Sequence, residues 1–417
     1  MAEAGRGPDT PHPPRPKRIR IVTTTRAEWH LLATVVRELA SRQAGGAAID
    51  VAVIAGGTHL LTQFGETVRE VRAEAQCPIV EVDFIDRKGA LPADHLGMTR
   101  MMGRAVTAFA DCFAVENPDL VVVLGDRFEI MSAALAAVSL RIALVHIEGG
   151  HVTQGAIDER YRHAITKLAD LHFPALPAQR KRLIAMGEAP ERIIASGAIG
   201  AAQARQALPL PARDMIAATG FDPRKRPIVV ATFHSETATD MRAEDVVSFI
   251  TELVTRSLAA SQPPPAYLFT MANLDPGGAV INRGLEQVAR RFPDDVRVTP
   301  SIGHSYLRVL ASAAGVIGNS SSGILEAAAM DIPVINVGRR QEGRDRYGDV
   351  TDCRWTVDDA LAGVDSMVTL WAAGERRAPG RSRSDNAPWV VIADGIVDFD
   401  TQGSAGKIYM FPSIEDK

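Results

Sequence analysis

Short apolar runs recur along the first half of the chain with longer amphipathic segments between them. Runs rich in Val, Ile and Leu predict buried strands at residues 18–24, 49–54, 79–82, 120–124 and 143–147. Residues 27–40 carry apolar side chains at helical spacing, and further helices are expected in the gaps, at residues 98–116, 128–140 and 157–168. Continuous apolar strands that alternate with helices are typical of a parallel sheet covered on both faces.

A second alternating set follows a stretch that is rich in proline and charge. This stretch, residues 207–226, is interpreted as a linker or hinge. Beyond it, strands are expected at residues 227–232, 267–270, 296–298, 315–317 and 333–337, and helices at residues 243–259 and 322–330. The pattern predicts an α/β protein with two doubly wound, Rossmann-like domains facing a cleft, an N-terminal domain at residues 18–206 and a C-terminal domain at residues 227–375.

Both ends of the chain depart from this pattern. Residues 1–17 contain five prolines and no apolar block, so we expect a disordered leader and no signal peptide. The tail, residues 376–417, begins with a basic, loop-like segment. Residues 389–400 (WVVIADGIVDFD) are interpreted as strand-like, and packing of this tail back onto the N-terminal domain is left open.

The composition excludes several functions. The 417 residues are 46% hydrophobic and 23% charged with a net charge of −4, so no nucleic-acid partner is expected. No apolar run approaches the roughly 20 residues of a membrane helix, so no membrane partner is expected. Three scattered cysteines favour the reducing cytoplasm. Neither a P-loop motif nor GxGxxG after a strand is present, which argues against a P-loop kinase and a dinucleotide redox cofactor.

Polar residues follow several strands at the edge where doubly wound sheets bind ligands. The loop GNSSSG, residues 318–323, precedes an expected helix, and its free backbone N–H groups suit a diphosphate. Arg26 and His234 would add positive charge or donors, and Glu326 would accept hydrogen bonds from ribose hydroxyls. A plain serine N-cap is the alternative. The spacing is not G-x-S-x-G, which excludes a serine-hydrolase elbow.

Four carboxylates at or near strand ends are candidates for proton transfer, provided that they converge. They are Asp126, Glu148, Asp158 and Glu159. The last two open a helix, where the dipole favours acidic residues, so one of them can serve that purpose alone. His146, Glu148 and His151 match no zinc-binding pattern, and no metal is expected.

Eight motifs connect these positions: TRAEWHLL (25–32), GTHL (57–60), GDRFE (125–129), HIEGG (146–150), IDERYRHAITKLADLHF (157–173), NLDPG (273–277), IGNSSSGILEA (317–327) and GRRQEGRDR (338–346). Together they resemble the UDP-N-acetylglucosamine 2-epimerases over roughly residues 18–371. HIEGGHVTQGAIDERYRH is similar to the hydrolysing branch, which feeds sialic and legionaminic acid synthesis. The non-hydrolysing branch usually carries HVEAGLR-like and PEE…NR segments there.

The resemblance implies the GT-B fold of many nucleotide-sugar glycosyltransferases and a UDP-linked 2-acetamido sugar as substrate, either UDP-GlcNAc or UDP-diacetylbacillosamine. A base would remove the C2 proton while the nucleotide leaves C1, and water would add to the resulting glycal. The products would be free nucleotide and the manno-configured sugar. The resemblance implies no cofactor, and a homodimer or homotetramer is expected.

The family's functional residues carry over to matching positions of this chain. The acidic and histidine catalytic positions match Asp126, Glu148, Asp158 and His234. The nucleotide-binding positions match Arg26, Ser320, Ser321, Ser322, Gly323 and Glu326. Weaker matches for substrate contacts are Arg127, Asn273, Ile302 and Arg344, the last of which lies in a loop that can equally be a solvated basic segment.

Three alternatives to a hydrolysing epimerase stay open on the sequence. A glycosyltransferase of the same fold would transfer the sugar to an acceptor. A non-hydrolysing epimerase would return an epimerised nucleotide sugar. A binding module without catalysis would bind UDP and release nothing.

Overall fold

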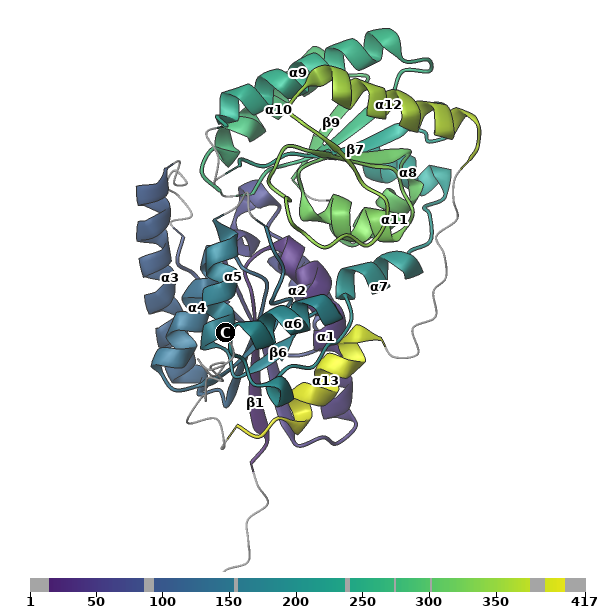
Figure 1. Cartoon of the computed structure of the whole chain (residues 1–417). Helices are drawn as coiled ribbons and strands as arrows, with labels where there is room; N and C mark the ends of the chain where they lie inside the picture. Colours follow the sequence, from purple (N-terminus) through teal and green to yellow (C-terminus); the bar gives the residue numbers. More distant parts are fainter. Residues whose placement is uncertain are drawn as a thin grey trace, which may run out of the picture.

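The computed structural model describes residues 15–85, 94–153, 157–236, 241–273, 275–300, 302–375 and 387–401. The disordered leader was expected at residues 1–17. Residues 1–14 lie outside the described part, and the prediction is wrong at Lys17, which begins the first strand. Two six-stranded sheets, stacked one above the other in Figure 1, form the two halves of the molecule. No helix within the described ranges is long and apolar enough to cross a membrane.

The first sheet has the order β3-β2-β1-β4-β5-β6, and every neighbouring pair is parallel. Successive strands are therefore added on one side of β1 up to β3, and then on its other side from β4 to β6. In such sheets ligands bind at the carboxyl ends of the strands where the order reverses, which here is between β1 and β4. The strands are β1 (Lys17–Thr23), β2 (Ile49–Gly56), β3 (Ile79–Val82), β4 (Leu120–Leu124), β5 (Ala143–Ile147) and β6 (Leu171–Phe173).

Helices cover both faces of this sheet, and each face has its own apolar core. One core packs against α1, and the other packs against α3, α4 and α5. The helices of this half are α1 (Arg26–Ala44), α2 (Val68–Glu74), α3 (His95–Glu116), α4 (Phe128–Ser139), α5 (Asp158–Leu168), α6 (Pro177–Ala185) and α7 (Ile199–Gln206).

The second sheet has the order β12-β11-β10-β7-β8-β9 and is also parallel throughout. Its strands are β7 (Ile228–Thr232), β8 (Ala266–Thr270), β9 (Val296–Thr299), β10 (Gly315–Gly318), β11 (Val334–Val337) and β12 (Thr351–Cys353). Its helices include α9 (Ala243–Ala260), α10 (Gly278–Arg291), α11 (Tyr306–Ser312) and α12 (Val357–Ala372). The prediction of two doubly wound domains with the GT-B arrangement is confirmed.

The observed elements depart from the predicted ones at several points. The three-residue edge strands β6 and β12 were not predicted, because three residues carry too little pattern. The stretch interpreted as a linker contains helix α8 (Ala212–Thr219), whose Met215 is buried in the core beneath β7. Residues after the serine loop form a π-helical turn at Gly323–Ala327.

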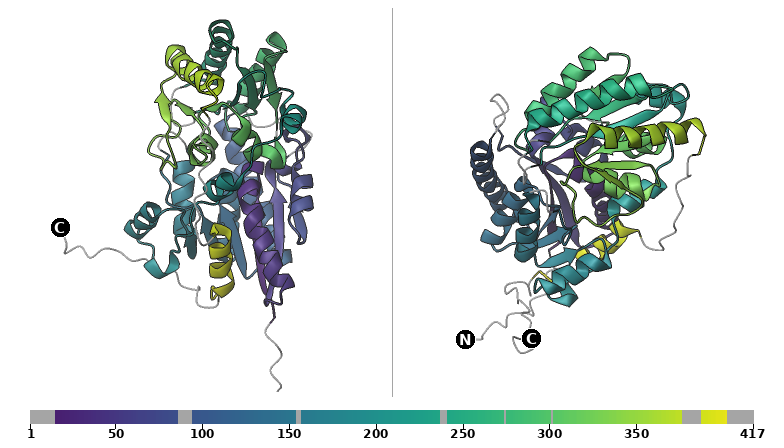
Figure 2. Two further views of the ribbon diagram at one scale, coloured as in Figure 1. Left: turned by 90° about the vertical axis from the view of Figure 1, so that its right-hand side faces the viewer. Right: turned by 45° about the horizontal axis from the view of Figure 1, so that its top comes forward.

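The strand expected in the C-terminal tail is wrong, because Pro388–Asp398 form helix α13. Ile392 and Ile396 are fully buried and lie one turn apart, which is helical and not strand spacing. They pack against the first domain's core beside α1, so the chain returns from the second domain to the first (Figure 2). The ammonium of Lys17 donates a hydrogen bond to the carbonyl of Val397 at 2.7 Å.

The docking of α13 predicts a stability contribution from its apolar face. Ile396→Ala is expected to lower the free energy of unfolding by about 2–5 kcal/mol, because it leaves a cavity in a closed core. Asp394→Ala on the exposed face of the same helix removes a surface ion pair with Arg42 and should cost below about 1 kcal/mol. Urea denaturation of both variants measures the difference, and equal effects would contradict the docking.

Candidate active site

Two adjoining cavities lie between the domains, with volumes of about 170 and 490 Å³. The smaller cavity contains carboxylates from the first domain, and the larger contains the serine loop of the second. Residues from both domains separate the two cavities and line both of them. These shared residues are Ala27, Leu31, Asn273, Ser321, Glu326 and Arg340. The site is therefore a two-part cleft.

Asp126 lies in the smaller cavity, immediately after β4. Arg162 of α5, with a side chain only 1% exposed, donates from Nε to its carboxylate at 2.8 Å. Burial by itself would raise the pKa of Asp126. Attraction to Arg162 and Arg344 outweighs burial and lowers the pKa to about 2. Asp126 is therefore ionised at neutral pH.

Asp158 lines the same cavity from the first turn of α5. Burial raises its pKa to about 7, and the neighbouring charges of Asp126 and Asp275 add to the shift. The adjacent Glu159 does not line the cavity but accepts hydrogen bonds from Arg162 and Thr153. Of the two acidic residues that open the helix, Asp158 therefore faces the site and Glu159 supports the structure.

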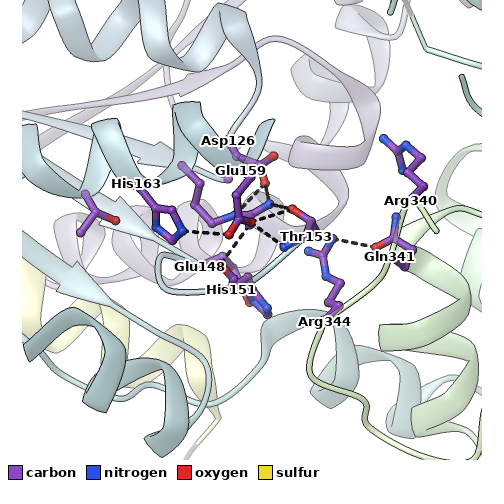
Figure 3. Close-up of polar contacts among 12 residues, drawn as sticks. Asp126, Glu148, His151, Thr153, Glu159, His163, Arg340, Gln341 and Arg344 are labelled. Carbon is purple, nitrogen blue, oxygen red and sulfur yellow. Dashed lines mark hydrogen bonds and ion pairs between the residues drawn. The ribbon is translucent and has the colours of Figure 1, made fainter. Parts of the chain in front are cut away.

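Glu148 follows β5 in a left-handed conformation, with φ of 65°. This conformation is costly for a residue with a side chain and is typical of functional loops. The Nε2 atom of His151 lies 2.6 Å from a Glu148 oxygen, and Figure 3 shows the two side chains next to each other. Both side chains line the smaller cavity, and burial lowers the pKa of His151. Three of the four carboxylates predicted for proton transfer, Asp126, Glu148 and Asp158, thus share one cavity.

His234, after β7, lines the larger cavity. Its backbone N–H donates to the side chain of Asn319 at 2.7 Å, and that side chain donates back to the His234 carbonyl at 2.8 Å. The backbone N–H of Asn273 donates to Nδ1 at 3.3 Å. Burial lowers the pKa of His234 to about 3. The ring is therefore neutral, and its single proton lies on Nε2.

The serine loop and Glu326 form another wall of the larger cavity. Ser322 accepts a hydrogen bond from the hydroxyl of Tyr306 at 2.6 Å. Burial raises the pKa of Glu326 to about 7, and its Oε2 atom has no hydrogen-bond partner among the described residues. Arg26 crosses from the first domain and donates to the carbonyl of Pro300 at 2.6 Å. The cavity therefore combines cationic, hydroxyl and carboxyl groups.

The structure places twelve of the fourteen predicted site residues on the cavity walls. The two exceptions are Ile302 and Gly323, which line neither cavity. Ile302 packs against the second domain's core, whereas its neighbour Gly303 lines the larger cavity. Gly323 is buried at the start of the π-helical turn.

Several site residues were not predicted. The motif GRRQEGRDR places Arg340 and Gln341 beside Arg344, and both donate to the carbonyl of Asn319, at 3.2 and 3.0 Å. Asp275, inside the motif NLDPG, is held 3.5 Å from Arg127 of the first domain. Their motifs were recognised, but nothing in one sequence shows which motif residues face inward. Arg162, His151 and Tyr347 also line the smaller cavity and were not among the predicted site residues.

A bidentate ion pair joins the two domains beside the smaller cavity. Arg182 of α6 donates to both oxygens of Asp345, at 2.7 and 3.0 Å, and also to the carbonyl of Gly150 at 3.1 Å. Asp345 directly follows Arg344 in the chain. The pair therefore holds the basic loop of the second domain over the carboxylates of the first.

Solved structures of sugar-nucleotide enzymes share this fold. The Neisseria meningitidis UDP-GlcNAc 2-epimerase bound to UDP-GlcNAc matches with a TM-score of 0.68 at 17% identity, over 91% of this chain and 98% of that one. The Methanocaldococcus jannaschii UDP-GlcNAc 2-epimerase in complex with UDP-GlcNAc and UDP matches with a TM-score of 0.65 at 17% identity, over 91% and 99%. These matches establish the fold.

The sequence establishes the family. The model of the UDP-N-acetylglucosamine 2-epimerase family matches residues 42–384, and the chain belongs to this family. The Legionella pneumophila UDP-N,N'-diacetylbacillosamine 2-epimerase (hydrolyzing) is 34% identical over 84% of this chain and 88% of its own length. The Campylobacter jejuni GDP/UDP-N,N'-diacetylbacillosamine 2-epimerase (hydrolyzing) is 31% identical over 81% and 84%.

The contacts of His234 predict its protonation state. With a pKa lowered to about 3, the ring should stay neutral and carry its proton on Nε2 throughout the neutral range. Long-range proton–nitrogen NMR of labelled histidine measures both properties, and His234→Asn assigns the signal. A proton on Nδ1, or titration of this ring near its ordinary value of about 6.5, would contradict the geometry.

Proposed function

We propose that the chain is a hydrolysing 2-epimerase that converts a UDP-linked 2-acetamido sugar and water into UDP and the free manno-configured sugar. One observation carries this proposal. Asp126 and Asp158 share a cavity, yet the pKa of one is lowered to about 2 and that of the other is raised to about 7. Paired carboxylates whose pKa values are driven apart are the signature of acid–base chemistry.

The first step is an elimination across C1 and C2 of the sugar. A carboxylate takes the C2 proton, the C1–O bond breaks, and the electron pair leaves on the diphosphate of UDP. A double bond forms between C1 and C2. With its pKa near 7, Asp158 is suited to accept and return a proton near neutral pH, whereas Asp126 stays ionised beside Arg162.

The leaving diphosphate needs donors that are in place before the bond breaks. Arg26, the Nε2 proton of His234 and the hydroxyls of the serine loop line the larger cavity and suit this role. Glu326, whose Oε2 has no hydrogen-bond partner within the described part of the chain, suits the ribose hydroxyls. We therefore assign UDP to the larger cavity and the sugar to the smaller one.

In the second step, the oxygen of water bonds to C1 and a proton adds to C2 on the face opposite to the one that lost it. This addition inverts C2 and releases a free sugar. The segment HIEGGHVTQGAIDERYRH and the two relatives named as hydrolysing enzymes support capture by water over return of UDP.

Those relatives favour a particular sugar. The chain is 34% identical to the Legionella diacetylbacillosamine enzyme and 27% identical to the Neisseria meningitidis UDP-N-acetylglucosamine 2-epimerase. We therefore propose UDP-diacetylbacillosamine as the preferred substrate, which would place the reaction before legionaminic acid synthesis. The three free cysteines support a cytoplasmic location. A homodimer or homotetramer remains part of the proposal.

Incubation with UDP-diacetylbacillosamine or UDP-GlcNAc, without any acceptor, tests this function. Release of UDP is expected, and in water labelled with oxygen-18 the label should enter C1 of the free sugar. An epimerised UDP-sugar without label would identify a non-hydrolysing enzyme. UDP release only after an acceptor is added would identify a glycosyltransferase, and binding of UDP without turnover would identify a binding module.

Asp126→Asn should lower kcat by about 10²–10⁴-fold, because the ionised carboxylate is lost from the proton-transfer set. The amide oxygen can still accept from Arg162, so the fold should survive, which circular dichroism checks. Asp398→Asn, at the exposed end of α13, is the matched control and should leave kcat unchanged. Near-wild-type turnover by folded Asp126→Asn would refute the assignment.

The raised pKa of Asp158 predicts the pH dependence. A carboxyl group with a pKa of about 7 is protonated below that pH and cannot accept the C2 proton. The value of kcat/KM should therefore rise with pH through about 7 and then level off, as assays from about pH 5 to 9 would measure. Asp158→Asn should abolish this rise of kcat/KM with pH, together with most of the activity. A flat profile would exclude Asp158 as the base.

A further inference from the structure

His146 is a fully buried polar residue that the reaction described above does not use. It lies on β5, two residues before Glu148, and lines neither cavity of the site. The ring therefore cannot touch the substrate. Since buried polar groups are retained only with partners, its hydrogen bonds indicate what it holds.

Both ring nitrogens have a partner on another element. The Nε2 atom lies 2.8 Å from the carbonyl oxygen of Gly125, and Nδ1 lies 3.1 Å from the hydroxyl oxygen of Thr166. A carbonyl only accepts, so Nε2 carries the proton and donates it. Burial lowers the pKa of His146 to about 3, so the ring is neutral and Nδ1 accepts from Thr166.

These partners connect the three elements that carry the catalytic carboxylates. Gly125 immediately precedes Asp126 after β4, and Thr166 lies on α5, the helix that begins at Asp158. His146 itself belongs to the strand that leads to Glu148. One imidazole thus links the β4 loop, β5 and α5.

The loop after β5 packs closely over this ring. A Cβ atom at Gly149 would lie 3.0 Å from Nδ1 of His146 and 3.1 Å from the Thr166 hydroxyl. Both distances are tighter than ordinary contacts, so a residue without a side chain suits this position. The close packing leaves the ring little room to move away from its two partners.

We propose that His146 is a positioning residue that sets the relative placement of Asp126, Glu148 and Asp158. This inference rests on the proposed function, because it takes these carboxylates as the catalytic groups. Proton transfer depends steeply on placement, and a shift of about 1 Å can cost 10²-fold in rate. The cost should fall on kcat, since His146 touches neither the sugar nor the nucleotide cavity.

Three variants test the proposal. His146→Leu removes both hydrogen bonds, and kcat should fall by about 10²-fold while KM changes little. His146→Gln has an amide that can donate to Gly125 and accept from Thr166, so it should recover much of the loss. His172→Leu is the matched control, because His172 is equally buried, lies opposite His146 in register on β6 and bonds to Glu188 instead.

The kinetic outcomes separate positioning from general stability. Wild-type kcat in His172→Leu together with a large loss in His146→Leu supports the proposal. Equal losses in both leucine variants, a loss confined to KM, or a glutamine variant as slow as the leucine variant would overturn it. A wild-type protein that releases no UDP would instead refute the proposed function.

Hydrogen exchange of the ligand-free protein gives a readout that does not depend on turnover. The amides of Gly125 to Arg127 should exchange faster in His146→Leu than in the wild type, because the anchor of that loop is lost. They should keep wild-type rates in His172→Leu. Unchanged protection in His146→Leu would show that the ring does not hold the loop, whatever the enzyme's substrate is.

Discussion

The buried ion pair between Asp126 and Arg162 is the interaction on which the site depends. Taking two charges out of water is expensive, and it is tolerated only when geometry and further hydrogen bonds compensate. Arg162 meets this condition, because it also donates to Glu159, Thr153 and the carbonyl of His151. It thereby fixes Asp126 as a permanent negative charge. That charge helps raise the pKa of Asp158, which can then exchange a proton near neutral pH.

The cleft itself depends on charges that meet across the domain boundary. Asp275 of the second domain lies 3.5 Å from Arg127 of the first, and Arg182 of the first holds Asp345 of the second. Such pairs are stronger where water is excluded. Helix α13 adds an apolar contact, because this helix follows the second domain in the chain and packs against the first domain's core. These contacts hold the two walls of the cleft against each other in the structure.

Much of the fold could be read from the sequence because parallel strands buried on both faces appear as unbroken apolar runs. The runs at β4 and β5 are examples, and the residues that follow them lead directly to Asp126 and Glu148. The same reasoning was wrong at residues 389–400. There an apolar run of similar composition forms a helix. It packs against α1, which lies more than 300 residues away in the chain, so no local pattern shows this contact.

By itself, the sequence determined the fold class, the family and the residue types at most of the strand ends that line the cleft. Short motifs carry this information, since each lies in one continuous segment of the chain. Only the tertiary structure decided which motif residues face inward, how Asp126 and Asp158 come to differ in pKa, and where Arg340, Gln341 and Asp275 lie. Those properties arise from burial and from charges on separate elements, within the first domain for Asp126 and Arg162 and across the cleft for Asp275 and Arg344, and both exist only in the folded chain.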